Sequence, residues 1–319
     1  HQLRDYQNRF NAGARLRGVN DEQIEEIWRM IMSFNGYSFC KPHSVSYARV
    51  SFQAAYLKVH FPAEFMAAVI SNQGGFYSAF AYVSEAKRMG INILAPDVTA
   101  SQISWTGRDQ FMRVGLLSIK GLSANTQARI VMEREKTDFA GLSDFLNRVR
   151  PDETDASGLI HSGALDRFHP FYPEEKHRAV LTWQISAWQK TRTRRNTNLS
   201  LFEAPASNAM PDLPADDERE QLRQEFKMLG FLCDRHPMTL FEDQLKNRKI
   251  TKIQSVSKNL GRRIQTAGWL ITGKTVLTQK GDPMKFITFE DDTGILETTF
   301  FPKTYHAFSH VLDYGRPYL

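Results

Sequence analysis

Apolar residues recur at intervals of three and four over most of the first 230 positions, a pattern typical of amphipathic helices. Behind Asn20-Asp21, a plausible helix start, Ile24, Ile27, Trp28 and Ile31 form one stripe. The spacing predicts two helices within 4–34. Further helices are predicted over about 44–60, from Pro62 to the Gly74-Gly75 pair, and over 76–89, 123–136, 142–149, about 159–168 and 218–229.

Short segments with alternating polarity predict strands elsewhere. Ile103–Trp105 and Phe111–Val114 are expected to form a hairpin around Gly107-Arg108. After position 262 the period changes to two, which predicts strands over 264–276, 285–290 and 295–301, then a helix over 303–311 and a strand over 316–319. Residues 189–217 have the polar composition of a linker. The predicted fold class is therefore α+β multidomain, with a mostly helical part followed by a small β part.

Composition supports a globular chain with a modest preference for polyanions. The 319 residues are 41% hydrophobic, and Lys plus Arg exceed Asp plus Glu by 41 to 35, a net charge of +6. Cys40 and Cys233 form no CxxC pair, which excludes a disulfide framework or a cysteine zinc site and fits a reducing cytoplasm. No apolar run is long enough to span a membrane. Because the chain begins with His1, we expect it to be a piece of a longer protein.

The clearest candidate for a phosphate site is the start of the helix expected at Ser44. Lys41 and His43 precede it, where unpaired backbone N–H groups favour anions, and Tyr47 and Lys58 add a hydroxyl and a cation along the same helix. The simpler alternative is a loop with an ordinary exposed lysine and histidine.

The residues around this site carry a family resemblance. Residues 36–48, 52–58, 61–68 and 89–98 closely resemble the fingers domain of the bacterial DNA polymerase III alpha subunits, the C family of DNA polymerases. Lys41, His43 and Tyr47 match the family pattern, whereas Cys40 and Pro42 depart from it, as does Ser44. The resemblance implies that the three matching residues approach the triphosphate of an incoming dNTP, and that Lys58 is a residue of the helix face.

A second resemblance points to the DNA backbone. Residues 116–131 resemble a helix-hairpin-helix motif, in which backbone N–H groups face one phosphate. The DNA-binding residues expected here are Lys120, Gly121, Leu122, Ser123 and Arg129. Residues 159–166 match the second half-motif of the family. The alternative for either half is a structural helix turn, because glycine at a helix junction is a common cap.

The predicted linker contains a candidate partner peptide. Asn198, Leu199, Ser200, Leu201 and Phe202 resemble the short segment with which bacterial polymerases grip the sliding clamp, with Asn198 where Gln is usual. A segment in a polar linker can offer an apolar pair to a pocket on a partner. The alternative is that Leu201 and Phe202 dock on their own protein.

Residues 262–319 resemble the OB-fold of the same family, and we expect its last strand to be missing. Such barrels bind single strands through aromatic and basic side chains. The candidates are Trp269, Phe286, Phe289, Lys274 and Lys285, with barrel packing as the alternative for each aromatic. His306 and His310 have zinc-like spacing without a third ligand and are interpreted as surface residues. Trp183 and Trp188 are interpreted as packing residues of a helix.

The resemblance implies five segments of a polymerase. These are the C-terminal part of the fingers (1–105), a tandem helix-hairpin-helix region (106–188), a linker with the clamp peptide (189–217), a connecting helical segment (218–261) and a truncated OB-fold (262–319). It further implies a bacterial cytoplasmic protein that binds DNA, dNTP and the clamp. The short linker resembles the error-prone translesion branch more than the replicative branch, which stays the alternative.

The resemblance also indicates what this segment lacks. The family holds Mg²⁺ with palm aspartates, which lie upstream of everything present here, and Asp216-Asp217 and Asp291-Asp292 are interpreted as solvated turn acids. We therefore expect no catalytic or metal-binding residue in this chain and no polymerisation by it alone. The alternative is a stand-alone DNA-binding module without a nucleotide role.

Overall fold

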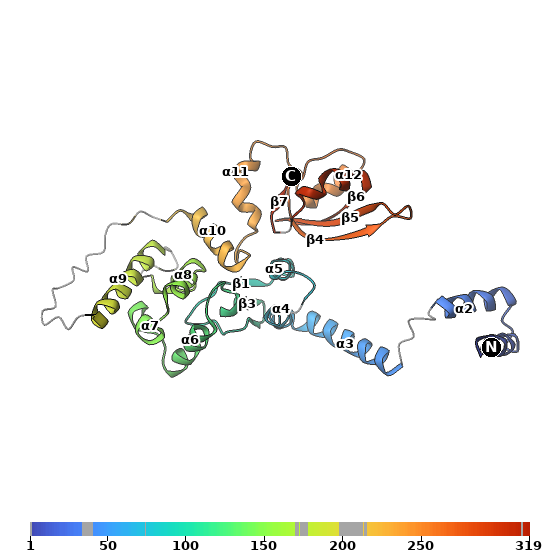
Figure 1. Ribbon diagram of the computed structural model, residues 1–319, viewed down its shortest axis with the longest axis horizontal. Coiled ribbons are helices and arrows are strands. Elements are labelled where there is room, and N and C mark those ends of the chain that lie inside the picture. Colours follow the sequence, from blue (N-terminus) through green and yellow to red (C-terminus); the bar gives the residue numbers. More distant parts are fainter. Residues whose placement is uncertain are drawn as a thin grey trace. The chain divides into compact units, whose positions relative to one another are not determined.

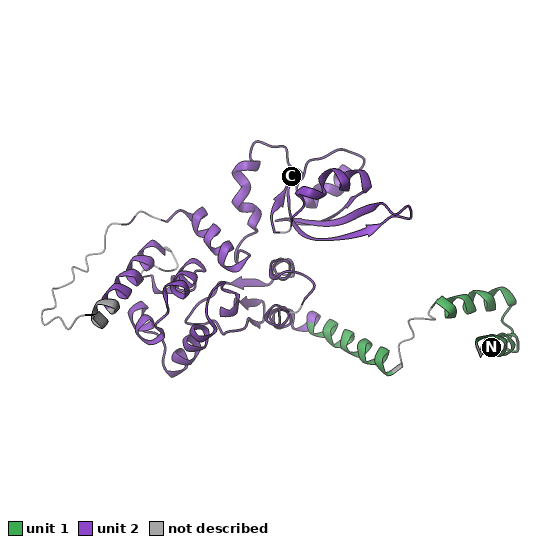
Figure 2. Ribbon diagram, viewed as in Figure 1, with its two compact units in different colours: residues 1–57 green, residues 58–319 purple. Residues whose placement is uncertain are grey.

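The computed structural model describes residues 2–33, 41–73, 75–169, 172, 178–197, 213, 216–313 and 315–319. It combines helices with two small sheets (Figure 1). The chain divides into two compact units, residues 1–57 and 58–319 (Figure 2). The first unit is helical, and the second holds the remaining helices and both sheets, so a mixed helix and sheet fold is confirmed.

The first unit consists of α1 (Gln2–Arg15), α2 (Asp21–Ser33) and most of α3 (Lys41–His60). The side-chain oxygen of Asn20 accepts a hydrogen bond from the backbone N–H of Gln23 at 2.8 Å, which confirms the predicted start of the second helix. The third helix begins at Lys41 rather than at Ser44. Pro42 is compatible with this earlier start because the first turn needs no backbone donor.

The helical part of the second unit follows the predicted order, except that α8 starts earlier, α9 is longer and α11 was not predicted. Its helices are α4 (Pro62–Ser71), α5 (Ala79–Arg88), α6 (Ala124–Lys136), α7 (Leu142–Val149), α8 (Glu153–His161), α9 (Arg178–Thr197), α10 (Glu218–Leu229) and α11 (Glu242–Leu245). Helix α8 begins six residues before the expected position, because Asp152 caps it by accepting from the Asp155 N–H at 2.8 Å. Helix α9 continues to Thr197, because the basic run that resembled a linker also favours helix.

Short 3₁₀ turns join several of these helices. They are η1 (Leu116–Ser118), η2 (Asp166–Phe168), η3 (Pro237–Phe241) and η4 (Ile253–Asn259), with η5 (Ser309–Val311) near the end of the chain. The helix predicted over 159–168 is thus the end of α8, a buried turn and η2.

The first sheet contains β1 (Asn92–Leu94), β2 (Thr106–Arg108) and β3 (Phe111–Arg113) in the order β1-β3-β2. The predicted hairpin exists, but its turn lies at Asp109-Gln110, and Gly107 lies inside β2. A Cβ on Gly107 would lie 2.2 Å from the carbonyl oxygen of Ala63. Gly107 is therefore required by the close approach of β2 to α4, and not by a turn.

The second sheet is antiparallel and contains β4 (Gly268–Leu277), β5 (Pro283–Asp291), β6 (Gly294–Phe300) and β7 (Pro317–Tyr318) in the order β6-β5-β4-β7. Helix α12 (Pro302–Phe308) packs against β5. This four-stranded half-barrel is compatible with an OB-fold (Figure 1). The predicted strands are confirmed within a few residues.

Trp269 links this sheet to the helices of the same unit. Its ring lies 5.9 Å from that of Phe80 and 5.2 Å from that of Phe226, and only 4% of the residue is exposed. Trp269 therefore belongs to the core and is not available for stacking on a single strand. A large apolar side chain at the start of a strand was compatible with either role until its neighbours were known.

One acid of each pair, Asp216 and Asp291, has an internal role, which corrects its interpretation as a solvated turn acid. Asp291 is buried and accepts hydrogen bonds from the backbone N–H groups of Ile253 and Thr293, at 2.9 and 2.7 Å. Asp216 accepts from the first N–H groups of α9, and Asp217 caps α10. Asp217 and Asp292 are exposed, and Asp292 pairs with Lys252 at the surface.

Candidate nucleic-acid interface

The predicted hairpin lies between η1 and α6. Ile119 and Leu122 bury their side chains, and the Leu122 N–H donates to the Ile119 carbonyl at 3.2 Å. Gly121 takes a φ of +80° at the exposed tip, a conformation that favours glycine. The two buried anchors and the glycine therefore hold Lys120 and Gly121 outward.

The hairpin presents backbone donors next to a cation. Among the described residues, the N–H groups of Gly121, Ala124 and Asn125 have no protein acceptor. The Lys120 side chain is exposed, while its backbone N–H is bonded to the Met228 carbonyl at 3.1 Å. One unpaired N–H group in the hairpin, two at the start of α6 and one nearby ammonium group suit a phosphate.

Asp155 stabilises the hairpin from its buried side. Only 2% of this residue is exposed, and its carboxylate accepts from the Ser123 N–H at 2.7 Å, the Ser123 hydroxyl at 2.8 Å and the Thr126 hydroxyl at 2.5 Å. Sequence reasoning missed it. The available signal was its i+4 neighbour Leu159, which places an acid on the apolar face of α8.

Three residues predicted to contact DNA have internal roles. The Ser123 N–H and hydroxyl face Asp155, and the Ser123 oxygen caps α6 by accepting from the Thr126 N–H at 3.2 Å. The Leu122 side chain is buried. The Arg129 guanidinium donates to the Val149 carbonyl at 2.9 Å and joins α6 to α7. The groups left for a phosphate are therefore on Lys120, Gly121 and the first two residues of α6.

The second half-motif is a buried turn. Residues 162–166 are all buried, and Gly163, with a φ of +82°, donates its N–H to the Ile160 carbonyl at 3.0 Å. Arg178 fills the space beside it and forms a buried ion pair with Asp166 at 2.9 Å. The structural alternative is therefore correct for this half, since its backbone donors are turned inward.

The predicted nucleotide residues lie on α3. Lys41 and His43 are in its first turn, and the His43 ring lies 4.5 Å from the Tyr47 ring in an edge-to-face arrangement. Tyr47 is 63% exposed. Lys58, toward the end of this helix, forms an ion pair with Glu85 at 3.4 Å. The assignment of a triphosphate to Lys41, His43 and Tyr47 stays a prediction.

The basic candidates of the second sheet do not share a face. Lys274 is opposite Phe286 in the β4–β5 register, and Lys285 is opposite Thr275. Because adjacent positions of a strand point to opposite faces, the two lysines diverge. Lys274 and the exposed Phe286 form the combination that fits a single strand, and a common groove containing both lysines is excluded.

The other candidate residues have no site in the described parts of the chain. The clamp-like residues Asn198, Leu199, Ser200, Leu201 and Phe202 lie outside the described residues. In the described parts of the chain, no three His, Cys, Asp or Glu side chains are grouped to hold a metal ion. None of the described helices is long and apolar enough to cross a membrane. Trp188 packs against the core and bonds to Asn147 at 3.0 Å, as expected of a packing residue.

Comparison with known proteins identifies the same region of the chain. A family described as a helix-hairpin-helix motif matches residues 90–177. The DNA polymerase III subunit alpha of Aquifex aeolicus is 30% identical over 316 residues, which cover 97% of this chain and 26% of that protein. The corresponding subunit of Pseudomonas fluorescens is 31% identical over 95% of this chain and 28% of its own length.

A similarity of the same size extends to another type of polymerase. The error-prone DNA polymerase of Alkalilimnicola ehrlichii is 28% identical over 96% of this chain and 29% of its own length. The chain thus spans about a quarter of the length of the curated relatives it matches.

Proposed function

We propose, because this chain belongs to the family of the bacterial DNA polymerase III alpha subunits, that it grips the sugar–phosphate backbone of a primer–template for a DNA-directed DNA polymerase. The observation that carries the proposal is the hairpin of Lys120 and Gly121, where unpaired N–H groups meet an exposed ammonium inside the matched helix-hairpin-helix region. Such a contact reads no base, so the grip is independent of sequence.

The finer assignments follow from the resemblance. Lys41, His43 and Tyr47 bind the triphosphate of the incoming dNTP, and residues 198–202 bind the sliding clamp. The parent enzyme supplies Mg²⁺ through palm aspartates that this chain does not contain, so the chain alone does not extend a primer. Its cellular compartment is the bacterial cytoplasm. Its parent acts in replication or in translesion synthesis.

The test is the fluorescence anisotropy of a labelled primer–template titrated with the protein at several salt concentrations. We expect affinity to fall steeply with salt, because each neutralised phosphate releases counterions. Lys120→Ala should weaken binding at every sequence and lower the salt slope by about one. The matched control is Lys136→Ala, which removes an exposed lysine at the opposite end of α6. Unchanged affinity in Lys120→Ala would refute the grip.

The same assay separates the polymerase role from a stand-alone DNA-binding module. If Lys41 and His43 hold a triphosphate, added dNTP should raise the affinity for primer–template, and His43→Ala should abolish that increase. A stand-alone module should show an affinity that dNTP leaves unchanged. Primer extension by this chain with Mg²⁺ and all four dNTPs would contradict its proposed inactivity.

A further inference from the structure

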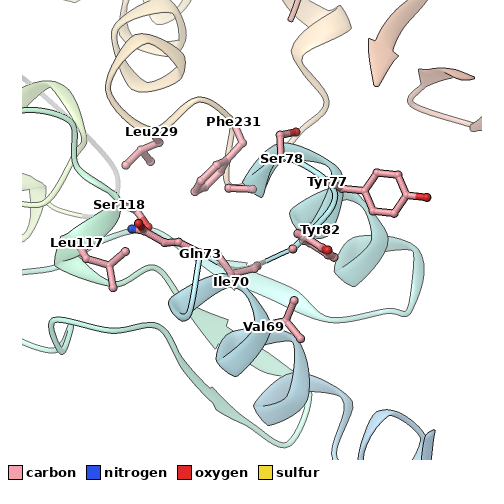
Figure 3. A pocket seen from close by; sticks show the side chains of 12 residues that line it. Val69, Ile70, Gln73, Tyr77, Ser78, Tyr82, Leu117, Ser118, Leu229 and Phe231 are labelled. Atoms are coloured by element: carbon pink, nitrogen blue, oxygen red, sulfur yellow. The ribbon is translucent and has the colours of Figure 1, made fainter. Parts of the chain in front are cut away.

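A pocket opens beside the hairpin, between α4, the start of α5 and the end of α10. Its volume is about 330 Å³. Figure 3 shows Leu229 and Phe231 on one side and Val69 on the opposite side, with Leu117 and Ser118 between them. The pocket is therefore built from segments that are far apart in sequence but belong to the same compact unit.

The lining combines aromatic and aliphatic walls with a few neutral polar groups. The half-buried Tyr82 contributes the ring that is available for stacking, and Phe231 is a buried part of the wall. Gln73, Ser78 and Ser118 contribute amide and hydroxyl groups (Figure 3). None of the described residues that line it is charged. A flat, neutral ring system with hydrogen-bonding edges fits such a lining, whereas a phosphate or a charged side chain does not.

Two segments of the pocket wall lead directly to the candidate phosphate site. Leu117 and Ser118 belong to η1, which leads through Ile119 into the hairpin. On the other side, the carbonyl of Met228, the residue before Leu229, accepts the Lys120 N–H at 3.1 Å. Ile119 and Lys120 lie between Ser118 and Gly121, so three steps of chain, at most about 11 Å, separate the pocket wall from the hairpin tip.

We propose that this pocket receives one unpaired nucleobase of a DNA strand whose neighbouring phosphate is held by Lys120 and the hairpin N–H groups. The proposal rests on the proposed function and adds to it a seat for a base. The charged part of the nucleotide is held at the exposed tip of the hairpin. Its neutral ring enters the uncharged pocket, where stacking does not depend on the identity of the base.

The test uses a set of primer–templates with a single-stranded template overhang, each carrying one abasic site at a successive position. We expect one position near the junction at which loss of the base weakens binding roughly tenfold, the range expected for one stacked base. Apart from a base stacked on Phe286, an abasic site elsewhere should leave affinity unchanged. Equal affinity for every abasic series and the intact DNA would overturn the proposal.

Variants locate the effect. Val69→Trp fills the pocket from a half-buried position on α4 and should abolish the difference between intact and abasic DNA. Val311→Trp introduces the same side chain on η5, away from the pocket, and should retain it. Tyr82→Leu, which removes a ring without adding volume, should reduce the difference if the tryptophan variant does not fold. If folded Val69→Trp or Tyr82→Leu protein keeps the whole difference in affinity between intact and abasic DNA, the base binds elsewhere.

Lys120→Ala distinguishes this proposal from the function on which it rests. It should weaken intact and abasic DNA equally, since the phosphate contact is lost in both. If the wild-type protein binds no DNA at low salt, both proposals fail. If it binds DNA through Lys120 but is indifferent to every abasic site, only the base pocket is refuted.

Discussion

Removing the Asp155 carboxylate should destabilise the second unit and loosen its hairpin. In Asp155→Ala, the Ser123 N–H, the Ser123 hydroxyl and the Thr126 hydroxyl lose their common acceptor, at distances of 2.7, 2.8 and 2.5 Å in the wild type. Thr126 is buried, so water cannot easily replace the lost partner there, whereas Ser123 is exposed and can be resolvated.

The magnitude follows from these three bonds. A hydrogen bond to a charged group contributes about 1.5–3 kcal/mol, and a buried donor left alone costs about 1–3 kcal/mol. Because resolvation at Ser123 recovers part of the loss, we expect a decrease of about 3–5 kcal/mol in the free energy of unfolding. This is a large share of the roughly 5–15 kcal/mol that stabilises an ordinary domain.

Urea titrations followed by circular dichroism measure this loss. The matched control is Glu153→Ala, which removes an exposed carboxylate from the same turn of α8 and should change stability by less than about 0.5 kcal/mol. Where Asp155→Ala still folds at low temperature, its affinity for primer–template should fall with the ordering of the hairpin. A loss of less than about 1 kcal/mol would refute the role of Asp155 as the support of this motif.

Three further predictions test the packing. Burial, together with the charge of Lys87, lowers the pKa of His236 from 6.5 to about 4. The stability that neutral His236 contributes is therefore fully present above pH 6.5 and is lost as the pH falls through 4. Urea titrations at pH 7 and 4.5 should show a loss, at most roughly 3 kcal/mol, that His236→Asn lacks; equal pH dependence would contradict this. Gly163→Ala should cost about 2 kcal/mol or more, because its Cβ would lie 2.6 Å from the Arg178 guanidinium at a φ of +82°; an unchanged melting temperature would count against it. Trp269→Ala should lower the free energy of unfolding by about 3–5 kcal/mol, because its ring is in the core. Phe286→Ala should leave stability unchanged and weaken single-strand binding. The reverse pattern in melting and anisotropy measurements would be inconsistent with the core position of Trp269.

The local elements follow from the sequence because their causes are local. Helices α7 and α10 begin and end where the apolar spacing predicts, and Gly230 ends α10 in the left-handed conformation that favours glycine. The tip of the hairpin was likewise predictable, because Lys120 and Gly121 need only a turn between two buried anchors. The family resemblance rests on the same kind of contiguous residues.

Tertiary structure decided which of the candidate residues face solvent. Trp269 fits a strand equally well as a stacking platform or as core, and only the rings of α5 and α10 bury it. The two half-motifs both carry a glycine in the left-handed conformation, yet Gly121 is exposed and Gly163 is covered by Arg178. Burial is a property of neighbours brought together from distant parts of the chain, so local pattern cannot specify it. For the same reason, the role of Asp155 and the pocket beside the hairpin depend on the packing of α4, α8 and α10 around the turn at Lys120 and Gly121.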